Sequence, residues 1–488
     1  MATMAEALAL HREGRVDEAA VLYDRILAAH PDQPDALHLR GVVSMQRGEL
    51  REAVTMIGKA IVLRPDDAAF YSNLAAALYR LQMFDQALNY ASRAMQLDSK
   101  SFQSRMITAQ CFYAKEMWQD SADAYNEALA LDPDNRNLID GRLGALQALA
   151  AHEQVVEFIE PLSCTMDDQL RISKAQALRE LKRFDEALSE LESCSAKAGH
   201  DWQVNMLKLM LDRGDKQGAI PHGQALLEAK DMLATQRLSE SSAAEFRSAW
   251  PRTVPEFRPN DDEHPERNVV CFSLWGDNPK YTYNAVLNAK KVPLEYPGWS
   301  ARFYVDGTVP TEIVQALVDY GARVIPVEAD PRTHLKLFWR FLATDDPSVE
   351  RFLCRDCDAV VNYREVAAVQ EWLLSGRRFH VMRDHPEHAE LMMAGMWGGV
   401  AGVLPQLSQQ AVEYYESHEP KWRWVDQDFL RDRVWPIIKA DCLVHDDFYA
   451  MGGDCRRFPA GSELSESEHV GGYRPRFAAE QDYAPKSN

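Results

Sequence analysis

Two aspartates one residue apart are the clearest chemical feature of this sequence. The segment RDCDAVVN, residues 355 to 362, places Asp356 and Asp358 after the apolar run RFLC. Carboxylates this close repel each other, so the spacing predicts either a shared counter-ion or a turn screened by water. Hard divalent cations prefer oxygen ligands and often retain phosphate oxygens. The pair therefore predicts a Mn²⁺ or Mg²⁺ site for a nucleotide diphosphate, with a solvated turn as the alternative.

A third interpretation is a phosphatase of the haloacid dehalogenase type. The first motif of that family is also an apolar strand followed by Asp-x-Asp, and FLCRDCDAVV fits it loosely. That motif normally opens its domain, whereas at least three candidate strands precede Asp356 here. Arg355 also interrupts the apolar run directly before the first aspartate. The phosphatase interpretation stays open as an alternative.

The elements around the aspartates alternate between strand-like and helical patterns. NVVCFSL (268–274), ARFYVD (301–306) and ARVIPV (322–327) read as strands. PTEIVQALVDYG reads as a helix between the second and third of them, and THLKLFWRFLAT reads as a helix after the third. This alternation predicts a mainly parallel sheet covered by helices on both faces. Ligands of such sheets bind beyond the carboxyl ends of strands, which is where Asp356 and Asp358 fall.

The first half of the chain repeats itself. Pro31 and Pro65 are 34 residues apart, and Ala19, Ala53 and Ala87 recur at the same spacing. A small residue where two helices cross and a proline after the second helix resemble the tetratricopeptide repeat. We count about six repeats, the fifth degenerate. Stacked helix pairs form a superhelix with a concave surface, and this family usually holds a peptide or protein there.

Polar and aromatic side chains are the candidates for that concave surface, namely Asn73, Tyr79, Gln110 and Tyr113. A stretch rich in Ser, Pro and charge follows the repeats. The predicted organisation is therefore an all-α repeat solenoid over residues 1–238, a linker over 239–267 and an α/β domain over 268–488.

Several phrases of the second half carry a resemblance when taken in order. They are FSLWGDNPKYTYNAVLNAK, YPGWSARFYVD, FWRFLATDD, RDCDAVVNYREVAAVQEW, HVMRDHPEH and GMWGG. Together, over nearly all of residues 268–450, they resemble bacterial glycosyltransferases of the GT-A type, some of which carry tetratricopeptide repeats. The resemblance implies a Rossmann-like, mostly parallel sheet and a nucleotide-sugar donor, most simply a UDP-sugar.

The resemblance also suggests roles in donor binding. Trp275, Gly276 and Asp306 follow the first two strands and become candidates for the base and ribose. Guanidinium groups match phosphate geometry, which makes Arg340 and Arg355 candidates for the diphosphate. The alternative is a core aromatic for Trp275 and ordinary salt bridges for the arginines.

The later phrases supply candidates for the sugar, the acceptor and the chemistry. Arg383, Asp384 and His385 form a predicted loop facing sugar or acceptor, and Trp397 in GMWGG is a candidate for stacking on a sugar ring. His388 completes His-x-x-His, but Pro386 argues against a helical zinc pair.

An inverting transferase needs a general base for the acceptor hydroxyl, and Asp426 or Asp428 in WVDQDFL is the candidate. The alternative is a helix cap. By resemblance, His445 is the predicted third metal ligand, with His469 as its competitor.

Bulk properties limit the function classes. The formal net charge is −20, whereas nucleic-acid binding needs a basic face. The eight cysteines are scattered, and no signal peptide or membrane span is evident, so we expect a cytoplasmic protein. We predict a metal-dependent glycosyltransferase whose repeats recruit the acceptor or a partner. The alternatives are a repeat scaffold with a catalytically idle C-terminal domain, or the phosphatase.

Overall fold

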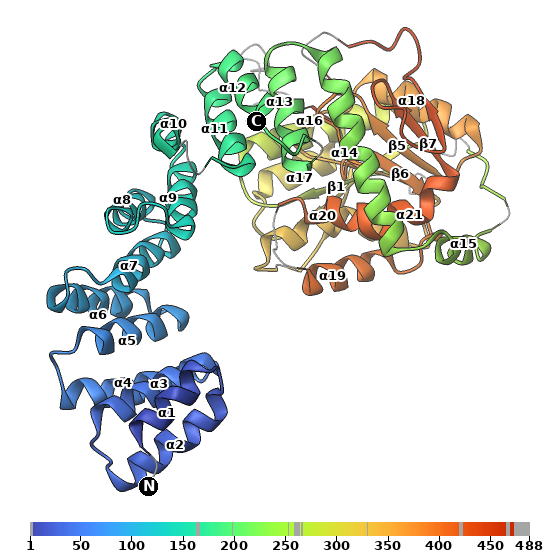
Figure 1. Cartoon of the computed structure of the whole chain (residues 1–488). Coiled ribbons are helices and arrows are strands. Elements are labelled where there is room, and N and C mark those ends of the chain that lie inside the picture. The colour runs from blue at the N-terminus through green and yellow to red at the C-terminus, as the bar shows by residue number, and fades with distance from the viewer. Residues whose placement is uncertain are drawn as a thin grey trace. The chain divides into compact units, whose positions relative to one another are not determined.

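A computed structural model of the chain describes most of its residues. The described ranges are 3–162, 166–197, 199–251, 253–257, 264, 267–328, 330–418, 423–464 and 469–472. The chain divides into two compact units, Met1–Ser195 and Ala196–Asn488. Each unit is described by itself below, and Figure 1 shows the elements of both.

The first unit consists of paired helices that follow one another along the chain (Figure 1). The pairs are α1 (Met4–Arg12) with α2 (Val16–Ala29), α3 (Pro34–Gln46) with α4 (Leu50–Leu63), α5 (Ala68–Arg80) with α6 (Phe84–Leu97), α7 (Phe102–Ala114) with α8 (Trp118–Leu129), α9 (Arg136–Ala148) with α10 (His152–Ile159), and α11 (Asp168–Glu180) with α12 (Phe184–Glu192). The predicted helical solenoid is confirmed for this half of the chain.

Small residues at the predicted spacing allow the helices of this unit to approach closely. Ala19, Ala53 and Ala87 are fully buried. The tight turns within pairs need a left-handed residue, and Gly14 and Gly48 supply it with φ of 77° and 82°. Later turns use residues with a side chain at the same conformation, which costs local free energy.

The second unit combines an eight-stranded sheet with helices. Its helices are α13 (His200–Asp212), α14 (Lys216–Arg237), α15 (Glu240–Ser248), α16 (Pro279–Glu295), α17 (Thr311–Asp319), α18 (Tyr363–Ser375), α19 (Leu407–Ser417), α20 (Val425–Phe429) and α21 (Trp435–Ile438), with the 3₁₀ helix η2 (Thr333–Asp345) and the π-helix η3 (Leu430–Val434). Its strands are β1 (Asn268–Leu274), β2 (Ser300–Val305), β3 (Arg323–Pro326), β4 (Arg351–Arg355), β5 (Phe379–Arg383), β6 (Trp397–Val400), β7 (Cys442–Asp446) and β8 (Asp454–Arg456).

The strand order is β3-β2-β1-β4-β6-β5-β7-β8. Strand β6 runs antiparallel to both of its neighbours, β4 and β5, and the other pairs are parallel. The carboxyl ends of β1, β2, β4, β5 and β7 therefore lie along one edge of the sheet. This arrangement confirms a mixed, mainly parallel sheet and brings together residues that are far apart in the sequence.

Both faces of the sheet are covered, which is why strands such as β1 are apolar at nearly every position. Cys271 and Cys354 face a core that includes α14, η2 and α19. Phe272 and Leu353 face the opposite core, built with α16, α17 and α18. Successive residues of one strand thus belong to different cores, as the period of two requires.

Strand β6 contains the last two glycines of GMWGG, a segment that the sequence analysis did not assign to a strand. Gly398 and Gly399 lie within this strand, and side chains of the neighbouring strands fill the space that a Cβ at either position would need. A Cβ at Gly398 would lie 2.5 Å from the Leu353 side chain, and one at Gly399 would lie 2.5 Å from that of Phe379. The glycines here serve packing between strands.

The segment between the repeats and the sheet also contains regular structure. Helices α13 and α14, within the predicted repeat region, belong to the second unit by their contacts, and α14 contacts η3 and α21. Helix α15 lies within the predicted linker 239–267 and contacts α21. In the part of the chain that the structure describes, no helix is both long and apolar enough to cross a membrane.

Candidate functional site

A pocket of about 380 Å³ opens at the carboxyl ends of β1 and β4. Trp275 follows β1, and Asp356 and Asp358 follow β4, and all three line the pocket. Asp426 of α20 and Arg340 of η2 line it as well. The structure thus brings five predicted site residues from four separate segments to one cavity.

Arg340 joins two of the pocket carboxylates. Its guanidinium donates hydrogen bonds to Asp356 and, at 2.6 Å, to Asp426. The arginine side chain is only 3% exposed. Burial raises the pKa of Asp426, and the nearby carboxylate of Asp356 adds to the increase while Arg340 opposes it. Asp426 is therefore a carboxylate that takes up a proton more readily than an exposed aspartate.

Asp358 is paired with a different cation. The Lys280 ammonium lies 2.9 Å from Asp358, and Lys280 also lines the pocket. Behind Asp356 stands Gly395, where any side chain would overlap the Asp356 carboxylate. Ala394, which precedes this glycine in the chain, also lines the pocket.

The turn that carries the aspartates is held from α16. Asn284 donates to the Asp358 carbonyl at 2.9 Å, and Asn288 donates to the Ala359 carbonyl at 2.8 Å. Lys291 donates to the Val361 carbonyl at 2.8 Å. The sequence analysis did not select these residues. Their signal was the spacing of Asn284 and Asn288, which places two amides one turn apart on a single helix face.

Other missed residues also line the pocket. Tyr281 and Trp424 are 38% and 41% exposed and supply aromatic surface. Arg423 lies with its guanidinium 4.7 Å from the ring centroid of Trp424. His334 is the fourth of these lining residues. No pattern marked them because each stands in a loop or at an element end and reaches the cavity only through the fold.

Three predicted donor-binding residues are placed outside the lining. The backbone N–H of Gly276 donates to Thr308 at 2.7 Å. Asp306 accepts from Lys336 at 2.8 Å and, although burial opposes it, this bond and those from Thr308 lower the pKa of Asp306. Arg355 is buried against Glu365 and donates to the Cys354 carbonyl at 2.8 Å. These contacts indicate structural roles.

The predicted acceptor loop is mostly internal. Arg383 is paired with Asp446 at 2.7 Å, and neither side chain has exposed surface. Asp384 accepts from Arg364 at 2.7 Å. Trp397 is fully buried on β6, with its ring centroid 4.9 Å from that of Phe352. The expectation that Trp397 stacks on a sugar is therefore corrected, because neither face of its ring is open.

Three histidines gather beyond β5. The ring centroids of His385, His388 and His469 are 4.7 to 5.9 Å apart. Nδ1 of His388 accepts from the Asp384 N–H, and Nδ1 of His385 accepts from the Glu387 N–H, both at 3.2 Å. A neutral imidazole with an accepting Nδ1 carries its proton on Nε2 and offers no lone pair there for zinc. Burial lowers the pKa of His385 to about 4.

Of the two predicted base candidates, only Asp426 lines the pocket. Asp428 is paired with Arg431 at 2.6 Å, one turn further along the chain. The two aspartates at this helix start therefore have different surroundings. Asp426 lines the cavity, and Asp428 lies in a local ion pair.

The predicted third metal ligand is not beside the aspartates. His445 lies on β7, three positions from β4 in the sheet order, and contacts His380 at 2.8 Å and Glu371 at 3.3 Å. Among the residues that the structure describes, no three His, Cys, Asp or Glu side chains are grouped so as to hold a metal ion. Asp356 and Asp358 offer suitable oxygens, but each is paired with a side-chain cation and His445 is not beside them. The predicted three-ligand centre of Asp356, Asp358 and His445 therefore does not fit this arrangement.

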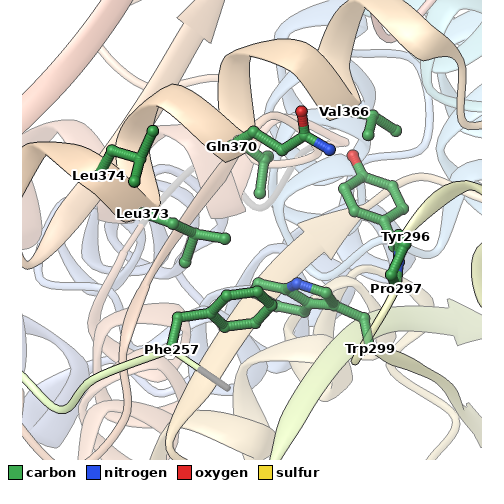
Figure 2. Close-up of a pocket in the computed structure, with 9 residues that line it drawn as sticks. Phe257, Tyr296, Pro297, Trp299, Val366, Gln370, Leu373 and Leu374 are labelled. Atoms are coloured by element: carbon green, nitrogen blue, oxygen red, sulfur yellow. The ribbon is translucent and has the colours of Figure 1, made fainter. Parts of the chain in front are cut away.

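A second pocket of about 380 Å³ is apolar and lies elsewhere on the second unit. Figure 2 shows Phe257 and Trp299 below it, with Leu373, Leu374 and Gln370 of α18 above. Among the residues that the structure describes, none of those lining it carries a carboxylate, an imidazole or a cationic group. The acidic pocket is therefore the candidate for chemistry.

In the first unit, polar side chains from successive repeats form a row. The Asn73 amide donates to His38 at 2.8 Å, and Gln103 donates to Asn73 at 3.1 Å. These residues belong to α3, α5 and α7, the first helices of three consecutive pairs. Of the other predicted concave-face residues, Tyr113 is 40% exposed.

Comparison with known proteins identifies the repeats. The tetratricopeptide repeat family matches residues 10–78 and again residues 73–136. The N-terminal region is therefore an array of tetratricopeptide repeats. Both matches end before the second unit begins.

Individual relatives agree with this assignment. The chain is 26% identical over 117 residues to the small glutamine-rich tetratricopeptide repeat-containing protein 2 of Mycosarcoma maydis, covering 24% of this chain and 33% of that protein. It is 32% identical over 119 residues to the Hsp70-Hsp90 organizing protein of Triticum aestivum, covering 24% and 20%. A crystal structure of MamA is 18% identical with a TM-score of 0.29, covering 38% and 94%. The chain spans a third or less of these two sequence relatives.

Proposed function

We propose that the repeat unit binds a protein or peptide segment and acts as an interaction scaffold. The observation that carries this proposal is the row of His38, Asn73 and Gln103 on three adjacent repeats. Buried His38 holds Asn73, and the partly exposed Asn73 and Gln103 offer amide groups to an extended ligand. Similarity to the Hsp70-Hsp90 organizing protein supports it, since that name describes a protein that organizes Hsp70 and Hsp90.

A peptide-binding measurement tests this proposal. Fluorescent peptides of varied charge, including acidic C-terminal peptides, are titrated with the full chain. Asn73→Ala combined with Gln103→Ala should weaken the best ligand at least about tenfold, the size of one or two lost hydrogen bonds. Lys59→Ala, an exposed position on α4, is the matched control. Equal binding by both variants would remove the polar row from the ligand site.

A second function is favoured by the acidic pocket, namely transfer of a sugar from a nucleotide donor to an acceptor hydroxyl. The cavity lies within the usual range of small-molecule sites. Trp275, Tyr281 and Trp424 supply ring faces for a base or sugar. Asp426, whose pKa is raised by burial, would accept the proton of the acceptor hydroxyl.

Nucleotide release from a panel of nucleotide sugars tests the transferase. Asp426→Asn should lower turnover at least about a hundredfold, the lower range for a general base. Asp428→Asn is the matched control, because that side chain lies in a local ion pair. Parallel reactions with Mn²⁺, Mg²⁺ and EDTA test the predicted metal requirement. Turnover of a phosphomonoester that depends on Asp356 would instead favour the phosphatase. No turnover of any kind would leave the scaffold function alone.

A further inference from the structure

The acidic pair of the pocket is already neutralised by the protein. Arg340 lies between Asp356 and Asp426, and Lys280 lies 2.9 Å from Asp358. A divalent cation bound to both members of the Asp-x-Asp pair would have to displace each of these side-chain cations. The competition between the ion and the side chains therefore decides whether a metal enters.

Arg340 is poorly suited to move away. It is 3% exposed, its backbone N–H donates to Ser273 at 3.0 Å, and its guanidinium also contacts the Arg355 carbonyl at 3.3 Å. Its departure would leave the buried carboxylate of Asp426 without a counter-ion, which is costly in a protein interior. Asp356 therefore keeps its guanidinium partner.

Lys280 and Arg423 extend the positive charge toward the opening. The Lys280 side chain is 37% exposed and its ammonium lies 5.2 Å from the ring centroid of Tyr281. Arg423 lines the same pocket, and its guanidinium lies beside the ring of Trp424. Ammonium and guanidinium groups beside aromatic rings are suited to a phosphate and a base held together.

We propose that this pocket binds a nucleoside diphosphate with Lys280, Arg340 and Arg423 in the place of a divalent cation. This inference rests on the proposed transferase function and specifies how that pocket recognises its donor. When the nucleotide binds, the Lys280 ammonium leaves the Asp358 carboxylate and pairs with a phosphate oxygen. Arg340 stays in place and supplies positive charge to the same pocket.

Calorimetric titration of the full chain with UDP and GDP tests the inference. Each nucleotide is titrated once in EDTA and once in Mn²⁺. For each nucleotide, we expect the dissociation constant in EDTA and the one in Mn²⁺ to lie within about threefold of each other, since no ion enters the contact. Lys280→Gln should weaken binding at least about tenfold in EDTA, the size of one charged hydrogen bond. Lys290→Gln, an exposed lysine on the same helix, is the control and should bind as the unaltered chain does.

The outcomes separate the inference from the function on which it rests. Binding that is lost in EDTA and restored by Mn²⁺ would overturn the cation substitution and leave the donor pocket intact. Failure of both nucleotides to bind in either condition would overturn the pocket assignment and the inference together. Unchanged binding in Lys280→Gln would exclude this lysine from the contact.

Discussion

The side-chain oxygen of Asn288 accepts a hydrogen bond from the backbone N–H of Val361 at 2.9 Å, across 73 residues of sequence. The same amide donates to the Ala359 carbonyl. One fully buried asparagine on α16 thus replaces the ladder partners that the chain loses when β4 ends. This contact fixes the turn on which Asp356 and Asp358 are presented.

Replacing Asn288 by alanine should therefore destabilise the second unit. Two buried backbone groups lose their partner, which costs about 1–3 kcal/mol. Chemical denaturation of the full chain measures the change, with Lys290→Ala as the control on the same helix. An unchanged unfolding midpoint for Asn288→Ala would show that water replaces the amide at no cost.

Gly141 provides a test of packing between repeats. A Cβ at this position would overlap the ring of Tyr125, which is 6% exposed. We expect Gly141→Ala to destabilise the first unit by about 1–3 kcal/mol because the core is overpacked. Gly58→Ala is the matched control. It lies within α4 with no atom within 4 Å of the added methyl group, so it should raise stability by up to about 1 kcal/mol. Thermal unfolding of both variants measures these changes, and an unchanged midpoint for Gly141→Ala would contradict the prediction.

The turn at Ala150 holds a left-handed backbone without glycine. Its φ is 52°, whereas Gly48 has φ of 82° at the corresponding turn of an earlier repeat. Ala150→Gly should stabilise the first unit by about 0.5–1 kcal/mol, the steric cost of the conformation less the entropy of glycine. Gly48→Ala should have the opposite sign. Destabilisation by Ala150→Gly would mean that the methyl group contributes packing that outweighs the strain.

Protonation of His38 should make the stability of the first unit depend on pH. Burial lowers the pKa of His38 to about 4, and its Nε2 lies 2.8 Å from the amide nitrogen of Asn73, which places it as an acceptor when neutral. In the unfolded chain this histidine has its ordinary pKa of about 6.5, so the unfolded state takes up the proton first as the pH falls. Stability should therefore decline between about pH 6.5 and 4, by about 1–2 kcal/mol from pH 7 to pH 5.

His38→Gln tests this assignment because glutamine retains an acceptor for Asn73 but does not titrate. The variant should lose less stability than the unaltered chain between pH 7 and pH 5 in denaturant titrations. Identical slopes would assign the pH dependence to other groups.

The repeats were predictable because their information is local. A 34-residue period and small residues at helix crossings depend only on helix geometry and nearest-neighbour packing. Strand β1 was predicted with its observed bounds, Asn268–Leu274, since a buried strand needs an apolar run. Strand β6 was missed because glycines disfavour strands on their own, and only the side chains of Leu353 and Phe379 explain Gly398 and Gly399.

The sequence by itself determined the repeat array, the alternation of strands with helices, and the position of Asp356 and Asp358 after a strand. Only the tertiary structure decided what those carboxylates contact. It placed Arg340, Lys280 and Asp426 around them, buried Trp397 in the core and left His445 beside His380 and Glu371. The reason is physical: periodicity is set by neighbours along the chain, whereas the charge around a carboxylate is set by side chains that strand order and helix packing bring from distant segments.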